Sequence, residues 1–281
     1  MLIVGLTACK GSSKTEPANA GSAAMKPANV EPAAKPTADA NAIARKIVDA
    51  QLAAIQSNKD PDLVTTFTKD AVILAGAPHK ASDGDLISLV ASLTPHDQLK
   101  EIKAGRIIAG GNDAAVWLYA ELSISKHNNE PGEKESDATA TVRATELATA
   151  ASGWKVVSAA FAEPDEPVHS GGAFPMIGTT AAGPVAQLLT APSLADDAAV
   201  ITGKDVAIGA EAAKTLAAWT AHKPTVDGNV REVHDAKWGF VQANLSWKDG
   251  DAPPFRASAH VIALAKPDGS WMIVALHLMK V

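Results

Sequence analysis

The sequence predicts an α+β fold made of two copies of one small unit, and three observations predict it. Helical patterns come first and strand-like segments follow between residues 39 and 161, which is typical of α+β proteins and not of βαβ proteins. A similar series of segments returns after residue 183. Residues 10–38, by contrast, are rich in Ala, Pro and Lys and contain almost no large apolar side chain. We therefore expect a disordered tether followed by two folded domains.

The composition is that of an ordinary soluble globular protein. The chain has 281 residues, of which 47% are apolar and 20% are charged. With 25 basic and 31 acidic residues, its net charge is 25 − 31 = −6, and its isoelectric point is near 5.7. This acidic balance argues against a nucleic-acid-binding protein. The sequence contains no run of apolar residues long enough for a transmembrane helix.

A single cysteine, Cys9, excludes an intramolecular disulfide framework and a Cys-based zinc finger. It ends the segment Leu6-Thr7-Ala8-Cys9, which resembles the bacterial lipobox. This resemblance implies that Cys9 is lipidated, and several acyl chains at about 0.8 kcal/mol per buried CH₂ would anchor the chain firmly. Lys10, in the position after the cysteine, implies by the same resemblance the outer membrane of a Gram-negative cell, facing the periplasm. The alternative is that chance apolar residues stand beside an unimportant cysteine.

The expected organisation follows from these segments. We interpret residues 1–9 as the remnant of a signal peptide; because no basic residue precedes its short apolar stretch, we expect the natural start to lie upstream. Residues 10–38 form the predicted tether, where recurring prolines favour extended backbone. The first domain is expected over 39–165, a linker over 166–183 and the second domain over 184–281.

Each element of the first domain has a local signal. Asp39 can cap a helix that runs to about Ser57, and Asp60-Pro61 can begin a second, short helix. A short strand over Ala71–Ala75 follows, and then a third helix that begins at Asp83 or Asp85 and carries apolar residues at helical spacing, namely Leu86, Leu89, Val90 and Leu93. Turn-forming residues separate four predicted strands: Gln98–Ala109, Ala114–Ser125, Ala138–Leu147 and Trp154–Phe161.

The second domain repeats parts of the first in the same order. At a constant offset of 117, Ala140–Arg143 falls on Ala257–His260 and Trp154 falls on Trp271. Other correspondences have drifting offsets, as loop-length differences would produce: Lys69–Ile73 with Asp196–Val200, Leu122–Ile124 with Leu245–Trp247, and the third helix with Glu211–Thr220. The second copy lacks an evident long first helix, because the segment Pro184–Thr190 is brief.

This order of helices, a short strand after an Asp, another helix and long strands that end in a Gly-Trp or Gly-Ser-Trp turn resembles the SnoaL-like branch of the nuclear transport factor two-like superfamily. The resemblance covers residues 38–163 well and 184–281 less well. It implies two cone-shaped domains, each with helices packed on a curved antiparallel sheet around an apolar pocket. Members of this fold usually pair sheet to sheet, so the resemblance also implies an internal pseudo-dimer.

The first copy offers a candidate polar cluster. Tyr119 and Glu121 share one strand face because they are two residues apart, and Arg143 shares a face of the next strand with Thr145. Tyr119, Glu121 and Arg143 could bind an anionic or carbonyl ligand in a cone pocket. The alternative is that Glu121 and Arg143 are solvated cross-strand partners.

The second copy offers His260 and His277, on strands joined by a Lys-Pro-Asp-Gly turn. These histidines are opposite each other if paired residue numbers sum to 537, and on different faces if the register slips by one residue. They could act as acid and base, or could be hydrogen-bonding residues of the sheet. A metal would need a third ligand such as His234 or Asp235, and no HExxH spacing exists, so we predict no metal site.

These patterns leave three functional hypotheses. The favoured one is a membrane-anchored envelope lipoprotein that binds a small molecule or a protein without catalysis, because no recognisable catalytic set is present. The first alternative is a lyase or isomerase that acts on a small apolar carbonyl compound, and the second is a scaffold with closed pockets. The expected partners are the membrane, through Cys9, a small apolar or anionic ligand, and an envelope protein, with no nucleic acid and no cofactor.

Overall fold

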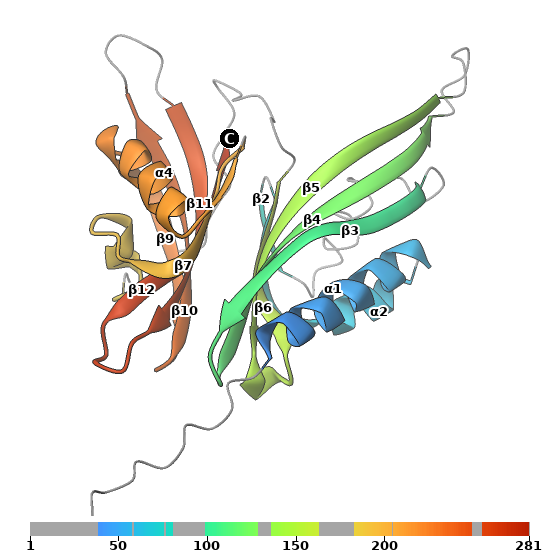
Figure 1. Cartoon of the computed structure of the whole chain (residues 1–281), viewed down its shortest axis with the longest axis horizontal. Coiled ribbons are helices and arrows are strands. Elements are labelled where there is room, and N and C mark those ends of the chain that lie inside the picture. Colours follow the sequence, from blue (N-terminus) through green and yellow to red (C-terminus); the bar gives the residue numbers. More distant parts are fainter. Residues whose placement is uncertain are drawn as a thin grey trace, which may run out of the picture. The chain divides into compact units, whose positions relative to one another are not determined.

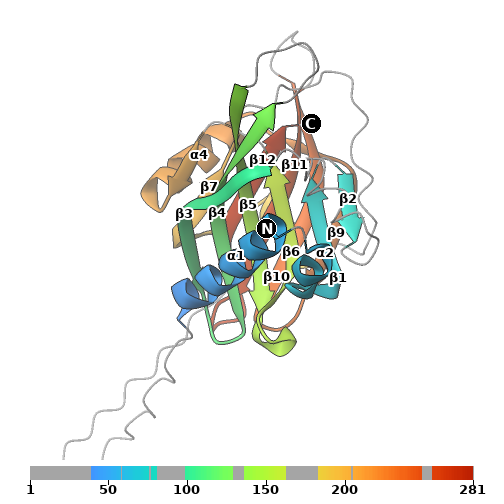
Figure 2. The ribbon, with the colours of Figure 1, turned by 90° about the vertical axis from the view of Figure 1, so that its right-hand side faces the viewer.

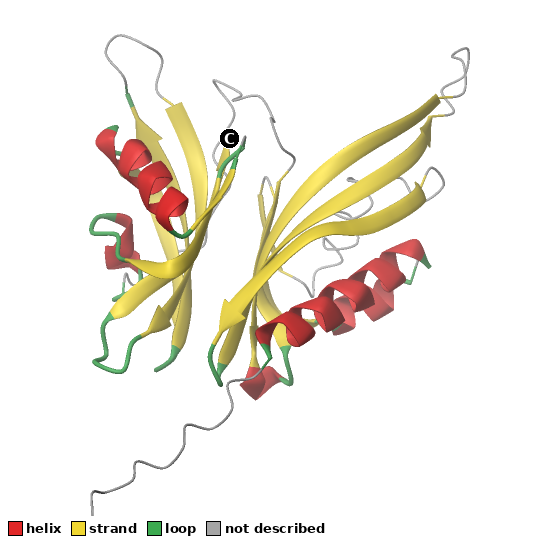
Figure 3. Cartoon of the chain, viewed as in Figure 1, coloured by secondary structure: helices red, strands yellow, loops and turns green. Residues whose placement is uncertain are grey.

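The computed structural model describes residues 39–57, 59–75, 77–80, 99–128, 136–162, 183–203, 205–248 and 255–280. The described residues all belong to one compact unit of two six-stranded sheets with helices on their outer sides (Figures 1 and 3). The predicted lipobox, tether, third helix and most of the linker lie outside the described residues. No helix in the described part of the chain is both long and apolar enough to span a membrane.

The first helix, α1 (Ala40–Gln56), begins where the sequence predicts. The Asp39 side chain accepts a hydrogen bond from the Ala42 N–H at 3.1 Å, which satisfies one of the free donors of the first turn. The second helix, α2 (Asp60–Thr65), has Pro61 in its first turn as predicted. Its capping position is Lys59 and not Asp60, and no side chain caps it, so the predicted cap is wrong by one residue.

The first sheet contains all the strands that the sequence predicts, and each is longer than expected except β6, which has the predicted length. The strands are β1 (Phe67–Ala75), β2 (Ala77–Lys80), β3 (Leu99–Gly111), β4 (Ala115–Asn128), β5 (Ser136–Thr149) and β6 (Lys155–Ala162), with the 3₁₀ turn η2 (Ala150–Ser152) between the last two. Their order is β2-β1-β6-β5-β4-β3. Only the β1–β6 pair is parallel.

The second sheet has the same topology. Its elements are η3 (Ala186–Leu189), β7 (Leu194–Ile201), β8 (Val206–Ile208), α4 (Ala210–Ala221), β9 (Thr225–His234), β10 (Trp238–Trp247), β11 (Phe255–Ala265) and β12 (Trp271–Lys280). The order β8-β7-β12-β11-β10-β9 repeats that of the first sheet, and the parallel pair, β7–β12, is in the same place. The predicted helix over Glu211–Thr220 is confirmed as α4, and among the residues described before β7 the short η3 stands where the first copy has α1.

Both faces of each sheet are covered. The outer face of the first sheet packs against α1 and α2, and that of the second against α4 and η3 (Figures 1 and 2). The inner faces pack against each other, and Trp117 and Leu147 of the first sheet join Phe240 and Ile262 of the second in one buried cluster. Alternate residues of a strand therefore serve different cores: Leu118 packs toward α1, and its neighbour Trp117 packs toward the second sheet.

Candidate functional sites

The polar residues predicted for the first copy lie on the inner face of its sheet. Tyr119 is fully buried, and its hydroxyl donates a hydrogen bond to Glu121 Oε1 at 2.6 Å. Glu121 is paired with Arg143 across the two strands, and Arg143 Nη1 donates to the Thr202 carbonyl of the second half at 2.7 Å. The Tyr119–Glu121 hydrogen bond and the pairing of Glu121 with Arg143 place these residues between the two sheets and not beneath the helices.

The two predicted histidines lie on the facing surface. The register of β11 and β12 places His260 opposite His277, the arrangement in which paired numbers sum to 537. His277 Nδ1 is 3.0 Å from the Thr145 hydroxyl, and His260 Nε2 is 2.7 Å from the Ser158 hydroxyl. Residues predicted separately in the two copies therefore form one group, which we call the inter-sheet polar cluster: Tyr119, Glu121, Arg143, Thr145, Ser158, His260 and His277.

Burial controls the acid–base chemistry of this cluster. It lowers the pKa of His260 to about 3. Burial first, and then the nearby His260 and Arg143, lower the pKa of His277 to about 3. Burial and Glu121 raise the pKa of Tyr119 above its ordinary value. Histidines this weakly basic stay neutral near pH 7 and are poorly suited to acid–base catalysis, so the cluster has the chemistry of a hydrogen-bonded contact between sheets.

We next asked where the structure places the residues that the sequence offers as metal ligands. Within the described ranges, no group of three His, Cys, Asp or Glu side chains is placed to hold a metal ion. The residues named as further ligands serve other contacts: His234 Nδ1 is 3.0 Å from Glu232 Oε1, and Asp235 Oδ1 accepts hydrogen bonds from the N–H groups of Lys237 and Trp238.

Sequence reasoning missed one buried acid in the first half, Glu146. It is fully buried on the outer face of β5, under α1, where Gln51 Nε2 donates to both carboxyl oxygens at 3.1 Å. Burial raises the pKa of Glu146 to about 7, and the Gln51 hydrogen bond lowers it by a smaller amount. No signal in the sequence points to this buried acid, because Thr145 and Glu146 interrupt the apolar residues of Ala144–Ala148 and only the structure shows that this stretch is buried on both faces.

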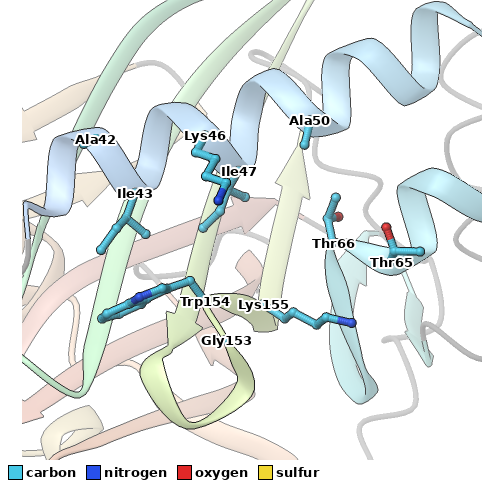
Figure 4. A pocket seen from close by; sticks show the side chains of 10 residues that line it. All are labelled: Ala42, Ile43, Lys46, Ile47, Ala50, Thr65, Thr66, Gly153, Trp154 and Lys155. Atoms are coloured by element: carbon cyan, nitrogen blue, oxygen red, sulfur yellow. The ribbon is translucent and has the colours of Figure 1, made fainter.

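The structure also contains a groove that the sequence did not predict. It has a volume of about 430 Å³ and lies between α1, the end of α2 and the turn into β6 (Figure 4). One end is apolar, with Ile43 above the Trp154 ring, and the other end carries Lys155 beside Thr65 and Thr66. The full lining is Ala42, Ile43, Lys46, Ile47, Ala50, Thr65, Thr66, Gly153, Trp154 and Lys155.

The backbone at the groove is strained. Trp154 has φ +63° directly after Gly153 at φ +72°, a left-handed conformation that a bulky residue rarely adopts. The Trp154 N–H donates to the Thr149 carbonyl at 2.9 Å, which holds this turn. The corresponding Trp271 has no positive φ, and its ring contacts His234 edge to face at 5.9 Å. The first half therefore accepts strain to place Trp154 at the groove.

Comparison with known proteins finds solved structures that resemble about half of the chain. No family model and no curated protein matches the chain. A ketosteroid isomerase-like protein from Erwinia carotovora atroseptica is 14% identical and covers 46% of this chain and 99% of its own, with a TM-score of 0.35. An NTF2-like protein from Cytophaga hutchinsonii is 16% identical and covers 44% and 97%, with a TM-score of 0.35. An uncharacterized protein with a cystatin-like fold from Caulobacter vibrioides is 15% identical and covers 45% and 91%, with a TM-score of 0.37.

Proposed function

We propose that this protein is a non-enzymatic module that binds a small molecule in the groove between α1 and Trp154. The observation that carries the proposal is the strained Trp154 at the edge of an open groove of about 430 Å³. This volume falls in the range of small-molecule sites, roughly 300–1,000 Å³. Strain of about 1–3 kcal/mol in a backbone position persists only when the surrounding structure enforces it, and it gathers at binding sites.

The lining favours binding over catalysis. Its lining residues in the described part of the chain include no Asp, Glu, His, Cys or Ser, and so no described pair of groups for acid–base or nucleophilic chemistry. The hydroxyls of Thr65 and Thr66 already donate to the carbonyls of Asp62 and Leu63, at 2.6 and 2.7 Å.

The anchor belongs to the same proposal. Lipidation of Cys9, supported by the lipobox pattern, would hold the module on an envelope membrane that faces the periplasm, with residues 10–38 as the tether. The two halves act as duplicated copies that pair as an internal pseudo-dimer, which the identical strand orders and the shared inner core support.

Native mass spectrometry of the full-length chain, purified from its own host, tests the proposal. We expect a co-purifying small molecule, and we expect Trp154→Ala to lose it while Lys69→Glu, an exposed change outside the groove, retains it. A wild-type chain free of bound species would contradict the binding function. Incorporation of a labelled fatty acid, absent in Cys9→Ser, tests the anchor separately.

A further inference from the structure

We infer that the ligand of the α1–Trp154 groove is an amphiphilic anion, with a ring or short chain at the Trp154 end and a carboxylate or a similar anionic group at the lysine end. This inference rests on the proposed binding function and specifies its ligand class. The argument uses the charge of the lining, the state of its hydroxyls and the conformation of Trp154.

The charge of the groove has one sign. Among the described residues that line it, Lys46 and Lys155 carry the charge, and neither ammonium group forms an ion pair with a described carboxylate. Figure 4 shows Lys46 reaching down from α1 toward the turn, and Lys155 extending from Trp154 toward Thr65. The whole chain carries a net charge of −6, so this local positive charge is not a consequence of a basic protein.

At the polar end, the donor that can recognise an anion is the Lys155 ammonium group, and Lys46 reaches into the groove from α1 beside Ile47 (Figure 4). Thr65 and Thr66 commit their hydroxyl protons to backbone carbonyls, so their oxygens can accept a further hydrogen bond but cannot donate one. An anionic group needs donors, and the ammonium groups supply them. A neutral alcohol could still donate to the threonine oxygens, which makes it the informative competitor.

The apolar end of the groove offers a reason for the strained backbone of Trp154. Ala42, Ile43 and Trp154 form this end, and the ring lies beneath Ile43 in Figure 4. The left-handed φ of Trp154 would be relieved by glycine, which adopts it without cost. A tryptophan kept in a position suited to glycine indicates that its ring is used there, as an aromatic surface for the apolar part of the ligand.

Calorimetric titration of the full-length chain with octanoate and with octan-1-ol tests the inference. The two probes share a chain length and differ in charge. We expect octanoate to bind up to about fivefold more tightly than octan-1-ol, because Lys46 and Lys155 are exposed and an ion pair at an exposed position is weak. We also expect its affinity to fall as salt is added.

Variants separate the two ends of the groove. Lys155→Glu and Lys46→Glu should each weaken octanoate by up to about fivefold and leave octan-1-ol unchanged, whereas Lys69→Glu should affect neither. Trp154→Gly should weaken both probes equally, and its melting temperature should not fall, because relief of the strained φ offsets lost packing. A tryptophan with a purely structural role would instead lower the melting temperature.

The outcomes distinguish this inference from the proposed function. Equal binding of octanoate and octan-1-ol, or octanoate binding that survives Lys155→Glu and Lys46→Glu, would overturn the anionic ligand while small-molecule binding stands. If neither probe binds but a co-purifying molecule is lost in Trp154→Ala, the ligand class is wrong and the groove remains the site. If neither probe binds and no molecule co-purifies, both proposals fail.

Discussion

The two halves of the chain share a strand order and differ in what covers it. In the first half, the outer face packs against α1, a helix of 17 residues. In the second half, the corresponding stretch is η3, four residues long, and the 12-residue α4 lies over β7 and β8. The groove is lined by α1 and Trp154, so it depends on an element that has no counterpart in the described part of the second half. Two halves with the same strand order can therefore carry different sites, because different elements cover their outer faces.

Each half also buries a carboxyl group, and each does so differently. Among the described residues, Gln51 is the one side chain that donates to Glu146, and burial raises the pKa of Glu146 to about 7. Glu232 accepts hydrogen bonds from the N–H groups of Gly183, Val185 and Ala186 at 2.6–3.1 Å, beside His234. Backbone donors at the start of η3 compensate the burial of Glu232, whereas burial of Glu146 is compensated mainly by protonation.

The largest expected effect tests whether the halves unfold as one. Trp117 is 1% exposed and lies in the core shared by the inner faces. Trp117→Ala should therefore cost about 3–5 kcal/mol of unfolding free energy and lower the stability of both sheets together. Denaturant unfolding followed by amide hydrogen exchange on strands of each sheet measures this. Loss of protection in the first sheet alone would show two independent halves. Val226→Ala, at a residue 37% exposed, is the control.

The second expected effect is a loss of stability in acid, caused by the histidines between the sheets. Their pKa values fall from 6.5 unfolded to about 3 folded, so between these values the unfolded chain binds more protons. The contribution is fully present above about pH 6.5 and decreases toward pH 3, on the order of 1 kcal/mol per pH unit for each histidine. Urea midpoints measured across this range should show the slope, and His277→Gln should reduce it. A flat profile in the wild type would contradict the buried neutral pair.

The third expected effect has the opposite sign and belongs to the first half. The pKa of Glu146 rises from 4.5 unfolded to about 7 folded, so its contribution is fully present below about pH 4.5 and is lost as the pH rises through 7. The loss amounts to roughly 3 kcal/mol. Glu146→Gln should remove this dependence and raise the urea midpoint at about pH 8. Glu232→Gln should instead lower the midpoint, because a weaker acceptor would face the backbone donors at η3. The same change of midpoint in both variants would contradict the difference between Glu146, which is buried with its pKa raised, and Glu232, which accepts backbone hydrogen bonds.

The smallest expected effect concerns a surface contact between the halves. Lys237 Nζ lies 2.9 Å from Asp113 Oδ2, and both side chains are more than half exposed, at 54% and 60%. Lys237→Ala should cost no more than about 1 kcal/mol, and the difference from wild type should shrink in high salt. Denaturant midpoints at low and high salt measure it. A larger, salt-independent loss would show that this pair, and not the buried core, holds the halves together.

The helices and strands could be predicted from the sequence because their signals lie in residues close together along the chain. Asp39 is a capping residue directly before an apolar periodicity, and α1 begins there. The strands predicted from alternation and turns are present in both halves, and the repeat of segments corresponds to the repeat of strand order. The β-strand register of His260 and His277 required the structure, because both registers fit the sequence pattern.

The sequence by itself determined which residues share a strand face, where α1 begins and which segments recur, because these properties follow from periods of 2 and 3.6 residues along the chain. Only the tertiary structure decided what each face meets. Both faces of these strands are covered, so alternation cannot tell that Tyr119 packs toward the other sheet and Glu146 toward α1. The contact of Thr145 with His277 joins residues 132 positions apart, and the groove joins a helix to a distant turn. Such contacts depend on long-range packing, which no local pattern records.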